Sequence, residues 1–293
     1  MVSQQVSLRA HVVLEALPYI RKFYGKTIVI KYGGAAQIDL NLAKEFARDV
    51  VLLKYVGMNP VIVHGGGPEI TRFMEKMGKK SEFVNGVRVT DAETVEMAEM
   101  VLSGKISKSI VSMINHAGGR AVSLSGKDGN LILAKRLRGG RKDMGFVGQI
   151  TGINPAIIES LDKSGFIPVI SSIAAGEEAE SLNINADEAA SAIAVALKAI
   201  KLIYLTDVDG IQDKDGELLA RLSLSDTKAL IRKKVIVGGM LPKAKCCMEA
   251  VANGVMSAHV IDGRIMHSVL LELFTDTGIG TMIKPGITPH AQV

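Results

Sequence analysis

The sequence contains no tryptophan and only two cysteines, Cys246 and Cys247, which are adjacent. Adjacent cysteines form no useful disulfide framework and do not have the spacing of metal ligands. We therefore expect two small buried residues on a helix, in a protein of a reducing compartment.

Long apolar runs and export signals are also lacking. The longest apolar stretch, at 189–205, is interrupted by Lys198 and Lys201 and falls short of the ~20 apolar residues of a membrane-spanning helix. Arg9 and His11 lie where a signal peptide needs an unbroken apolar core. These features predict a soluble protein with no membrane contact, in the cytoplasm, and leave open a plastid stroma location after removal of a transit peptide.

Signatures of several enzyme classes are missing as well. No G-x-x-x-x-G-K-[ST] loop is present, and no apolar strand pattern leads into G-x-G-x-x-G. The G-x-S-x-G, H-E-x-x-H and H-R-D motifs are absent too. P-loop hydrolases, zinc enzymes and protein kinases are therefore disfavoured, whereas a dinucleotide-dependent oxidoreductase remains an alternative that NADH binding would test.

Basic residues are in modest excess, with a formal net charge of +5 and an isoelectric point near 9.1. The densest basic run, 135–142, has no interleaved aromatic residue, so we expect a solvated hairpin loop there and no nucleic-acid partner. A net positive charge of this size also suits an enzyme that attracts anionic substrates.

Two segments, 28–34 and 61–67, each place an apolar β-branched strand before a glycine cluster and a helix-like pattern. Glycine lets backbone N–H groups converge on an anion without a Cβ in the way, and a helix start adds partial positive charge. The first segment also carries Lys31. Two such loops on neighbouring strands suit a site that holds several negative groups, as phosphoryl transfer requires.

The remaining pattern is strand, turn and helix in alternation, which is typical of a mostly parallel sheet with helices on both faces. We expect helices near 3–23 (interrupted at Pro18), 40–56, 68–77, 92–102, 186–198, 226–232 and 242–253, and strands near 27–32, 60–63, 167–170, 201–205 and 258–261. Residues 121–152 favour hairpins and loops. Because no linker rich in proline or serine is present, two lobes would share one sheet or be tightly joined.

Four charged residues stand beside turns, and each has an alternative structural explanation. Lys31 follows a strand, but a structural lysine usually lies on a solvated face. Arg88 has a planar fork suited to a carboxylate, or closes a surface turn. Asp187 begins an alanine-rich helix, where its structural alternative is a helix N-cap or a first-turn acid. Lys243 begins another helix, where its charge opposes the helix dipole, a local conflict typical of functional positions.

Seven motifs in this order resemble the amino-acid kinase family, and within it the branch that acts on N-acetyl-L-glutamate. The motifs are 31–34, 64–68, 85–90, 125–129, 183–187, 205–210 and 238–243, and together they span nearly the whole chain. The resemblance implies an α/β fold with an open, mainly parallel central sheet sandwiched by helices. It also implies three parts: an oligomerisation and regulatory helix at 1–23, an amino-acid-binding and dimerisation lobe at 24–198, and an ATP-binding lobe at 199–293.

The implied activity is ATP-dependent phosphorylation of the side-chain carboxylate of N-acetyl-L-glutamate in arginine biosynthesis, with Mg2+ accompanying ATP and no protein ligand to the metal assigned. The resemblance makes Lys31, Lys243 and Asp187 catalytic, with Asp187 orienting both ammonium groups. It assigns substrate binding to Gly65, Gly66, Gly67, Arg88 and Asn183. It assigns contacts with ATP to Gly33, Gly34, Thr206, Asp207, Gly210, Gly239 and Met240.

The N-terminal helix and the C-terminal tail further resemble an arginine-inhibited, hexameric branch built as a trimer of dimers. L-Arginine would then bind near Tyr19, His267, Glu272 and Gly280. A signalling protein of the PII type is a possible partner. His267 and Glu272 have the alternative of an ordinary helix surface.

Two alternatives share the implied fold. Another family member would phosphorylate aspartate, glutamate, carbamate or a nucleoside monophosphate, and a substrate panel distinguishes these acceptors. A noncatalytic arginine sensor would keep the fold without turnover, and an acyl-phosphate assay distinguishes it.

Overall fold

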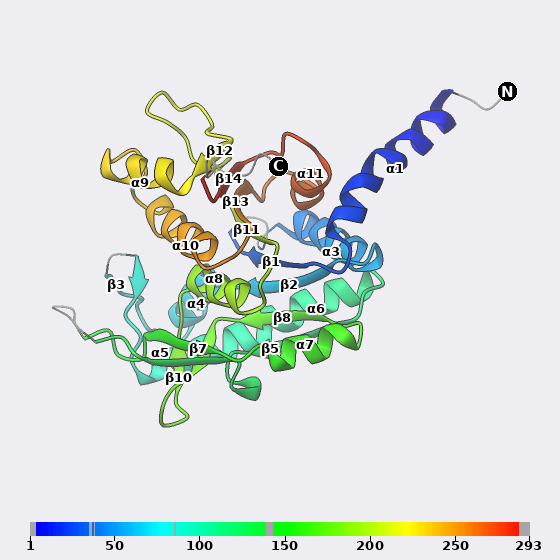
Figure 1. Ribbon diagram of the computed structural model, residues 1–293. Coiled ribbons are helices and arrows are strands. Elements are labelled where there is room, and N and C mark those ends of the chain that lie inside the picture. The colour runs from blue at the N-terminus through cyan, green and yellow to red at the C-terminus, as the bar shows by residue number, and fades with distance from the viewer. Residues whose placement is uncertain (1–3, 35–36, 38, 85, 139–142, 287–293) are drawn as a thin grey trace.

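An eight-stranded sheet forms the central layer of the computed structural model, which describes residues 4–34, 37, 39–84, 86–138 and 143–286 (Figure 1). The strand order is β12-β14-β13-β11-β1-β2-β8-β5. The strands are β12 (Arg221–Ser223), β14 (Thr281–Lys284), β13 (Ser257–Asp262), β11 (Lys201–Thr206), β1 (Thr27–Tyr32), β2 (Asn59–His64), β8 (Ile167–Ser171) and β5 (Ala121–Ser125). Neighbouring strands run parallel except β13 and β14, which are antiparallel.

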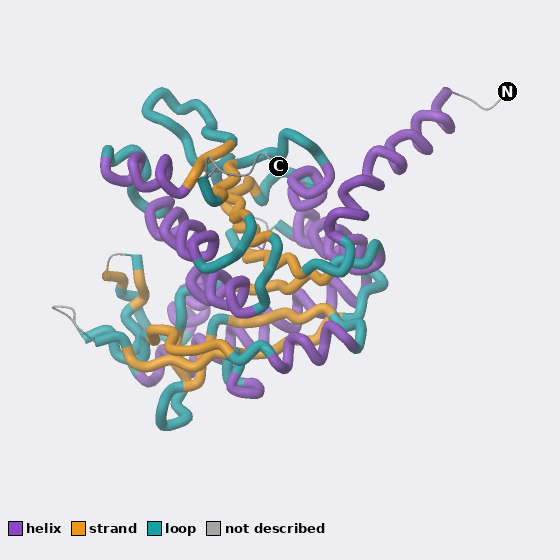
Figure 2. Tube along the Cα trace, viewed as in Figure 1, coloured by secondary structure: helices purple, strands orange, loops and turns teal. Residues whose placement is uncertain are grey.

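Helices cover both faces of this sheet (Figure 2). One face packs against α3 (Leu40–Tyr55), α6 (Ser107–His116), α11 (Ser268–Phe274) and the end of α1 (Gln4–Phe23). The other packs against α7 (Ala156–Lys163), α8 (Ala186–Ala196), α9 (Leu224–Arg232) and α10 (Met240–Ala252). Side chains alternate along β1: Ile28 and Ile30 join the first core and Val29 the second. The predicted sandwich is confirmed.

A smaller four-stranded sheet lies beside one end of the central layer, in the order β10-β9-β6-β7. Its strands are β10 (Ser181–Asn183), β9 (Ile173–Ala175), β6 (Ile132–Arg136) and β7 (Gly148–Ile153), and a short hairpin pairs β3 (Phe83–Val84) with β4 (Val87–Arg88). The pairing of β6 with β7 confirms a hairpin in the middle of the chain, although 121–125 is an edge strand of the central sheet instead. Part of the expected basic hairpin loop, 139–142, lies outside the described residues.

Three expectations about helices need correction. The first helix runs through Pro18 without a break, because the ring fixes φ at a helical value and only one ladder hydrogen bond is lost. The helix expected at 92–102 is longer: α5 (Ala92–Glu99), a π-helix η1 (Met100–Ile106) and α6 follow one another directly. The helix α7 lies in a segment for which the sequence indicated none, since it has only eight residues.

Both glycine loops lie at the carboxyl edge of the sheet. The register pairs Lys31 with Val63 and Tyr32 with His64 on parallel neighbours, so β1 and β2 end side by side. A helix α4 (Gly67–Lys76) begins directly after the second loop. Within the described residues, no helix is long and apolar enough to span a membrane.

Candidate active site

Three charged side chains from distant parts of the chain meet at this edge. Lys31 extends from the end of β1, Asp187 from the first turn of α8, and Lys243 from the first turn of α10. The Lys31 Nζ lies 3.1 Å from Asp187 Oδ1, and the Lys243 Nζ lies 2.6 Å from Asp187 Oδ2. The expected proximity of the three side chains is therefore present, and their catalytic roles stay predictions.

The carboxylate of Asp187 is buried and serves as the common counter-ion of the two lysines. Burial acts to raise the pKa of Asp187, but the charges of Lys31 and Lys243 outweigh it and hold that pKa below its usual value. Its Oδ1 atom has the close ion pair with Lys31 but no well-aligned hydrogen bond. The cap of α8 is Asn185, whose side chain accepts from Asp187 N, so Asp187 is not the N-cap but does lie in the first turn, as the other structural alternative has it.

A cavity of about 420 Å³ opens on one side of this ion cluster. It is lined by Lys31, Gly65, Gly66, Gly67, Arg88, Asn183 and Asp187, with apolar contributions from Ile70, Phe83, Val87, Leu102, Val147 and Ile184. We call it the first cavity. All the residues expected to bind the amino-acid substrate line it together.

Arg88 is a buried residue of the first cavity, on β4. Its Nη2 donates to the Gly67 carbonyl at 2.9 Å and to Thr71 Oγ1 at 2.8 Å, and its guanidinium lies 4.6 Å from the centre of the Phe83 ring. Burial lowers the pKa of this guanidinium, which remains charged because its ordinary value is so high. The surface-turn alternative is therefore wrong, since Arg88 is an anchored cation inside the molecule.

A second cavity, of about 510 Å³, opens on the other side of Lys243. It is lined by Thr206, Asp207, Gly210, Gly239, Met240 and Lys243, with apolar side chains of Val208, Ile211, Val235, Ile236 and Val237. We call it the second cavity. Lys31 and Asp187 line the first cavity and Lys243 the second, so the ion cluster stands where the two spaces meet.

The first glycine loop touches the lining of the second cavity. Gly34 has a φ of +68°, and a Cβ built there would lie 2.3 Å from Asp207 Oδ1. A Cβ on Gly33 would lie 3.0 Å from Lys31 Nζ. The loop therefore needs glycine for close approach as well as for backbone conformation.

Tyr19 and His267, two of the residues expected to bind arginine, contact different elements. Tyr19 donates to Asp276 Oδ1 at 2.6 Å and packs edge-on against Phe274, which attaches the end of α1 to α11. His267, in the left-handed region at φ +58°, instead has its Nδ1 2.7 Å from Asp49 Oδ1 on α3. Its side chain is therefore engaged with α3.

Glu272 belongs to a buried cluster that sequence reasoning missed. Its Oε1 lies 2.6 Å from His259 Nδ1, and His259 Nε2 lies 3.0 Å from Lys201 Nζ. Burial lowers the pKa of Lys201 to about 8, although the charge of Glu272 opposes this. The available signal was a lysine at the start of a strand that is otherwise apolar. The surface alternative for Glu272 is wrong, because this side chain is buried. Gly280 lies against β13, the strand of His259, with its Cβ position 2.2 Å from Val260 O.

The two cysteines are buried on α10, as expected. Burial raises the pKa of the Cys246 thiol to about 12, and burial also raises the pKa of the Cys247 thiol well above its ordinary value. Neither thiol is therefore activated as a nucleophile.

Comparison with known proteins gives one consistent family. A model of the amino acid kinase family matches residues 26–262. The chain is 57% identical over 281 residues to an acetylglutamate kinase of Caldanaerobacter subterraneus subsp. tengcongensis, with 94% of the chain and 93% of that protein covered. It is 52% identical over 290 residues to an acetylglutamate kinase of Citrifermentans bemidjiense, with 96% and 99% covered.

Solved structures agree with this grouping. An N-acetylglutamate synthase from Neisseria gonorrhoeae, complexed with coenzyme A and N-acetyl-glutamate, aligns with a TM-score of 0.86 and 26% identity over 95% of the chain. The chain covers only 64% of that protein's length. The same synthase complexed with coenzyme A and L-arginine aligns at 0.82, over 94% of the chain and 65% of the synthase. A Giardia lamblia carbamate kinase bound to AMP-PNP, at 19% identity and a TM-score of 0.66 over 89% of the chain and 99% of the kinase, shows a shared fold.

Proposed function

The chain belongs to the amino acid kinase family, and we propose that it transfers the γ-phosphoryl group of ATP to the side-chain carboxylate of N-acetyl-L-glutamate, in arginine biosynthesis. The observation that carries this proposal is the carboxylate of Asp187 held between two lysines where two cavities meet. The acceptor would occupy the first cavity and ATP the second. The acetylglutamate kinases at more than 50% identity support this choice of acceptor.

Charge repulsion is the central difficulty of such a reaction. A carboxylate must approach a triphosphate in line, so the protein mainly has to position two anions and neutralise them. The acceptor is already ionised near pH 7, so no general base is needed. Its oxygen attacks the γ-phosphorus, the bond to the β,γ-bridging oxygen breaks, and ADP leaves with that electron pair.

Lys31 and Lys243 would stabilise this transfer from opposite sides. Each ammonium group lies within 3.1 Å of Asp187, so their direction is set before substrates bind. Preorganised charges cost little reorganisation in the transition state, which is the main source of their catalytic effect. The N–H groups of Gly33, Gly34 and Gly66 would bind the oxygens of the migrating phosphoryl group.

Acceptor binding would rest on Arg88 and Asn183. Arg88 would pair with the α-carboxylate, because it brings a buried guanidinium to a cavity whose other lining cation, among the described residues, is Lys31. Asn183 donates to Thr90 Oγ1 at 3.2 Å, which orients its amide at the cavity wall. The apolar side chains of the first cavity would cover the acetyl methyl group and the methylene chain.

Mg2+ would enter with ATP and be held chiefly by phosphate oxygens. Asp207 and Asp213 are carboxylates that line the second cavity, and one or two carboxylates with substrate phosphates are a usual magnesium environment. These residues would hold the ion, which would neutralise charge on the β- and γ-phosphates.

We also propose inhibition by L-arginine in a hexamer, with the inhibitor between α1 and the C-terminal part of the chain. Support comes from the attachment of Tyr19 to Phe274 and Asp276, which joins the end of α1 to the C-terminal part of the chain. A PII-type partner is part of the same proposal. The parts 1–23, 24–198 and 199–293 keep the roles that the resemblance implies.

A coupled ADP-release assay with N-acetyl-L-glutamate, combined with hydroxylamine trapping of the acyl phosphate, tests the proposal. We expect turnover that needs both acceptor and ATP, with a product that forms a hydroxamate. Aspartate, glutamate, carbamate and nucleoside monophosphates serve as competing acceptors, and a preference for any of them contradicts the proposal. Absence of turnover with nucleotide and arginine binding retained would instead favour a noncatalytic sensor.

A further inference from the structure

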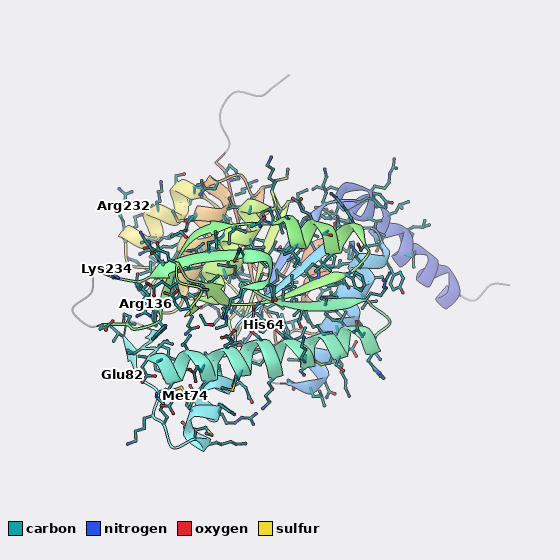
Figure 3. All side chains as sticks on the ribbon, turned by 90° about the horizontal axis from the view of Figure 1, so that it is seen from below. His64, Met74, Glu82, Arg136, Arg232 and Lys234 are labelled. Atoms are coloured by element: carbon teal, nitrogen blue, oxygen red, sulfur yellow. The ribbon has the colours of Figure 1, made fainter. Side chains whose placement is uncertain are left out.

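His64 is a fully buried residue between the end of β2 and the second glycine loop. Figure 3 shows it inside the molecule, beside the long helical run that contains η1. Its ring contacts two groups: Nε2 lies 2.7 Å from Ser107 Oγ, and Nδ1 lies 3.1 Å from the Gly65 carbonyl oxygen. The mechanism above uses neither His64 nor Ser107.

The partners decide where the ring proton lies. A carbonyl oxygen only accepts, so the contact with Gly65 requires the proton on Nδ1, and Nε2 then accepts the Ser107 hydroxyl proton. Burial lowers the pKa of His64 to about 4, so the ring is neutral at physiological pH and has one donor and one acceptor. Each ring nitrogen therefore has one hydrogen-bond partner.

The Gly65 carbonyl is held from two directions. Besides the His64 ring, Gln37 Nε2 donates to it at 3.1 Å from the region of the first glycine loop. In a planar trans peptide, the carbonyl of Gly65 and the N–H of Gly66 point in opposite directions. Anchoring that oxygen therefore also aims the Gly66 N–H, which stands at the N-terminus of α4 among N–H groups without helical partners.

The π-helix supports the same loop from behind. A Cβ on Gly66 would lie 2.2 Å from Ile106 Cδ1 and 2.9 Å from Leu102 Cδ2, so these side chains pack directly on the loop. Ser107 follows η1 immediately and supplies the hydroxyl that holds His64. A single π-turn within a long helix is a local departure that occurs often at functional sites.

We propose that His64 and Ser107 are positioning residues, which hold the 65–67 loop so that its N–H groups are aimed at the transferred phosphoryl group. The inference rests on the proposed function and deepens it, because it names what preorganises the loop. The two residues touch neither substrate. Their effect passes through the orientation of one peptide group.

The test compares Ser107→Ala with Ser103→Ala. Ser103 lies within the same π-helix and bonds Ser171 Oγ at 2.9 Å, so its variant loses a similar hydroxyl without touching His64. We expect Ser107→Ala to lower kcat about tenfold, as loss of a supporting contact does at preorganised sites, with the KM for ATP unchanged. Ser103→Ala should keep kcat close to that of the unaltered chain, and thermal unfolding checks that both variants fold. Equal kcat values for the two variants overturn the inference.

Variants of His64 provide a second, independent measurement. His64→Asn keeps a donor near the Nδ1 position, towards Gly65, whereas His64→Gln keeps a polar group near the Nε2 position, towards Ser107. We expect a higher kcat for His64→Asn, because the bond to Gly65 acts on the loop directly. If the kcat of His64→Gln equals or exceeds the kcat of His64→Asn, the inference is contradicted. If the unaltered chain itself shows no acetylglutamate-dependent turnover, the proposed function fails, which is a distinguishable result.

Discussion

At the scale of single residues, function depends on charges placed where charges are costly. Lys31, Asp187 and Lys243 are largely removed from water, and they are tolerated because the Asp187 carboxylate pairs with both ammonium groups. A carboxylate with two ammonium partners leaves the group with a net positive charge. That charge is what a phosphoryl group passing between two anions requires.

Removing either lysine should therefore affect catalysis more than folding. We expect Lys31→Ala and Lys243→Ala to lower kcat at least ~100-fold, since one preorganised stabilising group contributes about 3 kcal/mol to such a transition state. Lys245→Ala is the matched control, because this lysine lies on the same helix and is exposed. Steady-state turnover measures the effect, and an unchanged kcat would disprove the role of the lysine concerned.

Arg88 allows a prediction that separates the two cavities. Arg88→Ala should raise the KM for N-acetylglutamate about tenfold or more and leave the KM for ATP nearly unchanged, because the residue lines only the first cavity. Arg72→Ala, an exposed arginine of α4, serves as the control. The role of Arg88 in acceptor binding is disproved if the substitution changes only the KM for ATP.

At the scale of elements, the site is assembled from the ends of strands and helices. Parallel strands β11, β1 and β2 finish at one edge, and α4, α8 and α10 begin there. Unpaired N–H groups and the helix dipoles make such an edge attractive to anions. The loop after β1 adds a glycine that contacts Asp207 of the second cavity.

Substitution of that glycine should therefore affect the nucleotide. In Gly34→Ala, a residue with a Cβ must adopt a positive φ, and the added Cβ clashes with the Asp207 carboxylate. We therefore expect kcat/KM for ATP to fall about tenfold or more. Gly25→Ala is the control, because it has φ +67° but no atom within 4 Å of the added Cβ. It should lower the melting temperature without changing the KM for ATP. Similar ATP kinetics in both variants would remove the loop from the nucleotide site.

At the scale of the whole molecule, one continuous sheet joins the segments that line both cavities. The β1 and β11 strands are hydrogen-bonded neighbours, so the parts of the chain before and after 198 are not separate bodies linked by a tether. The helix α1 is different, because most of it projects away from this body (Figure 1). Its apolar residues Val13, Leu14 and Leu17 are exposed, by 70%, 62% and 46%.

In the proposed hexamer, a second chain would cover these exposed apolar residues of the projecting helix. If the proposal holds, deleting residues 1–17 should reduce the proposed hexamer to dimers and relieve the proposed arginine inhibition, while Phe23, which is buried, keeps the remaining turn in place. Light scattering and inhibition curves measure the two effects. Leu14→Asp should reproduce the change in mass without shortening the chain. A truncated protein that is still hexameric and equally sensitive to arginine contradicts the proposal.

The sequence alone determined the local pieces. Strands that run into glycine clusters, the Asn-x-Asp start of α8 and the order of seven motifs are each encoded within a few neighbouring residues, and they were sufficient to predict the family and the sandwich. The tertiary structure decided which pieces meet. The pairing of Lys31 and Lys243 through Asp187, the side chain of His267 turned to α3, and the bond from Ser107 to His64 all depend on strand order and helix packing. Such contacts join residues far apart in the chain, so no local pattern of polarity or conformation specifies them.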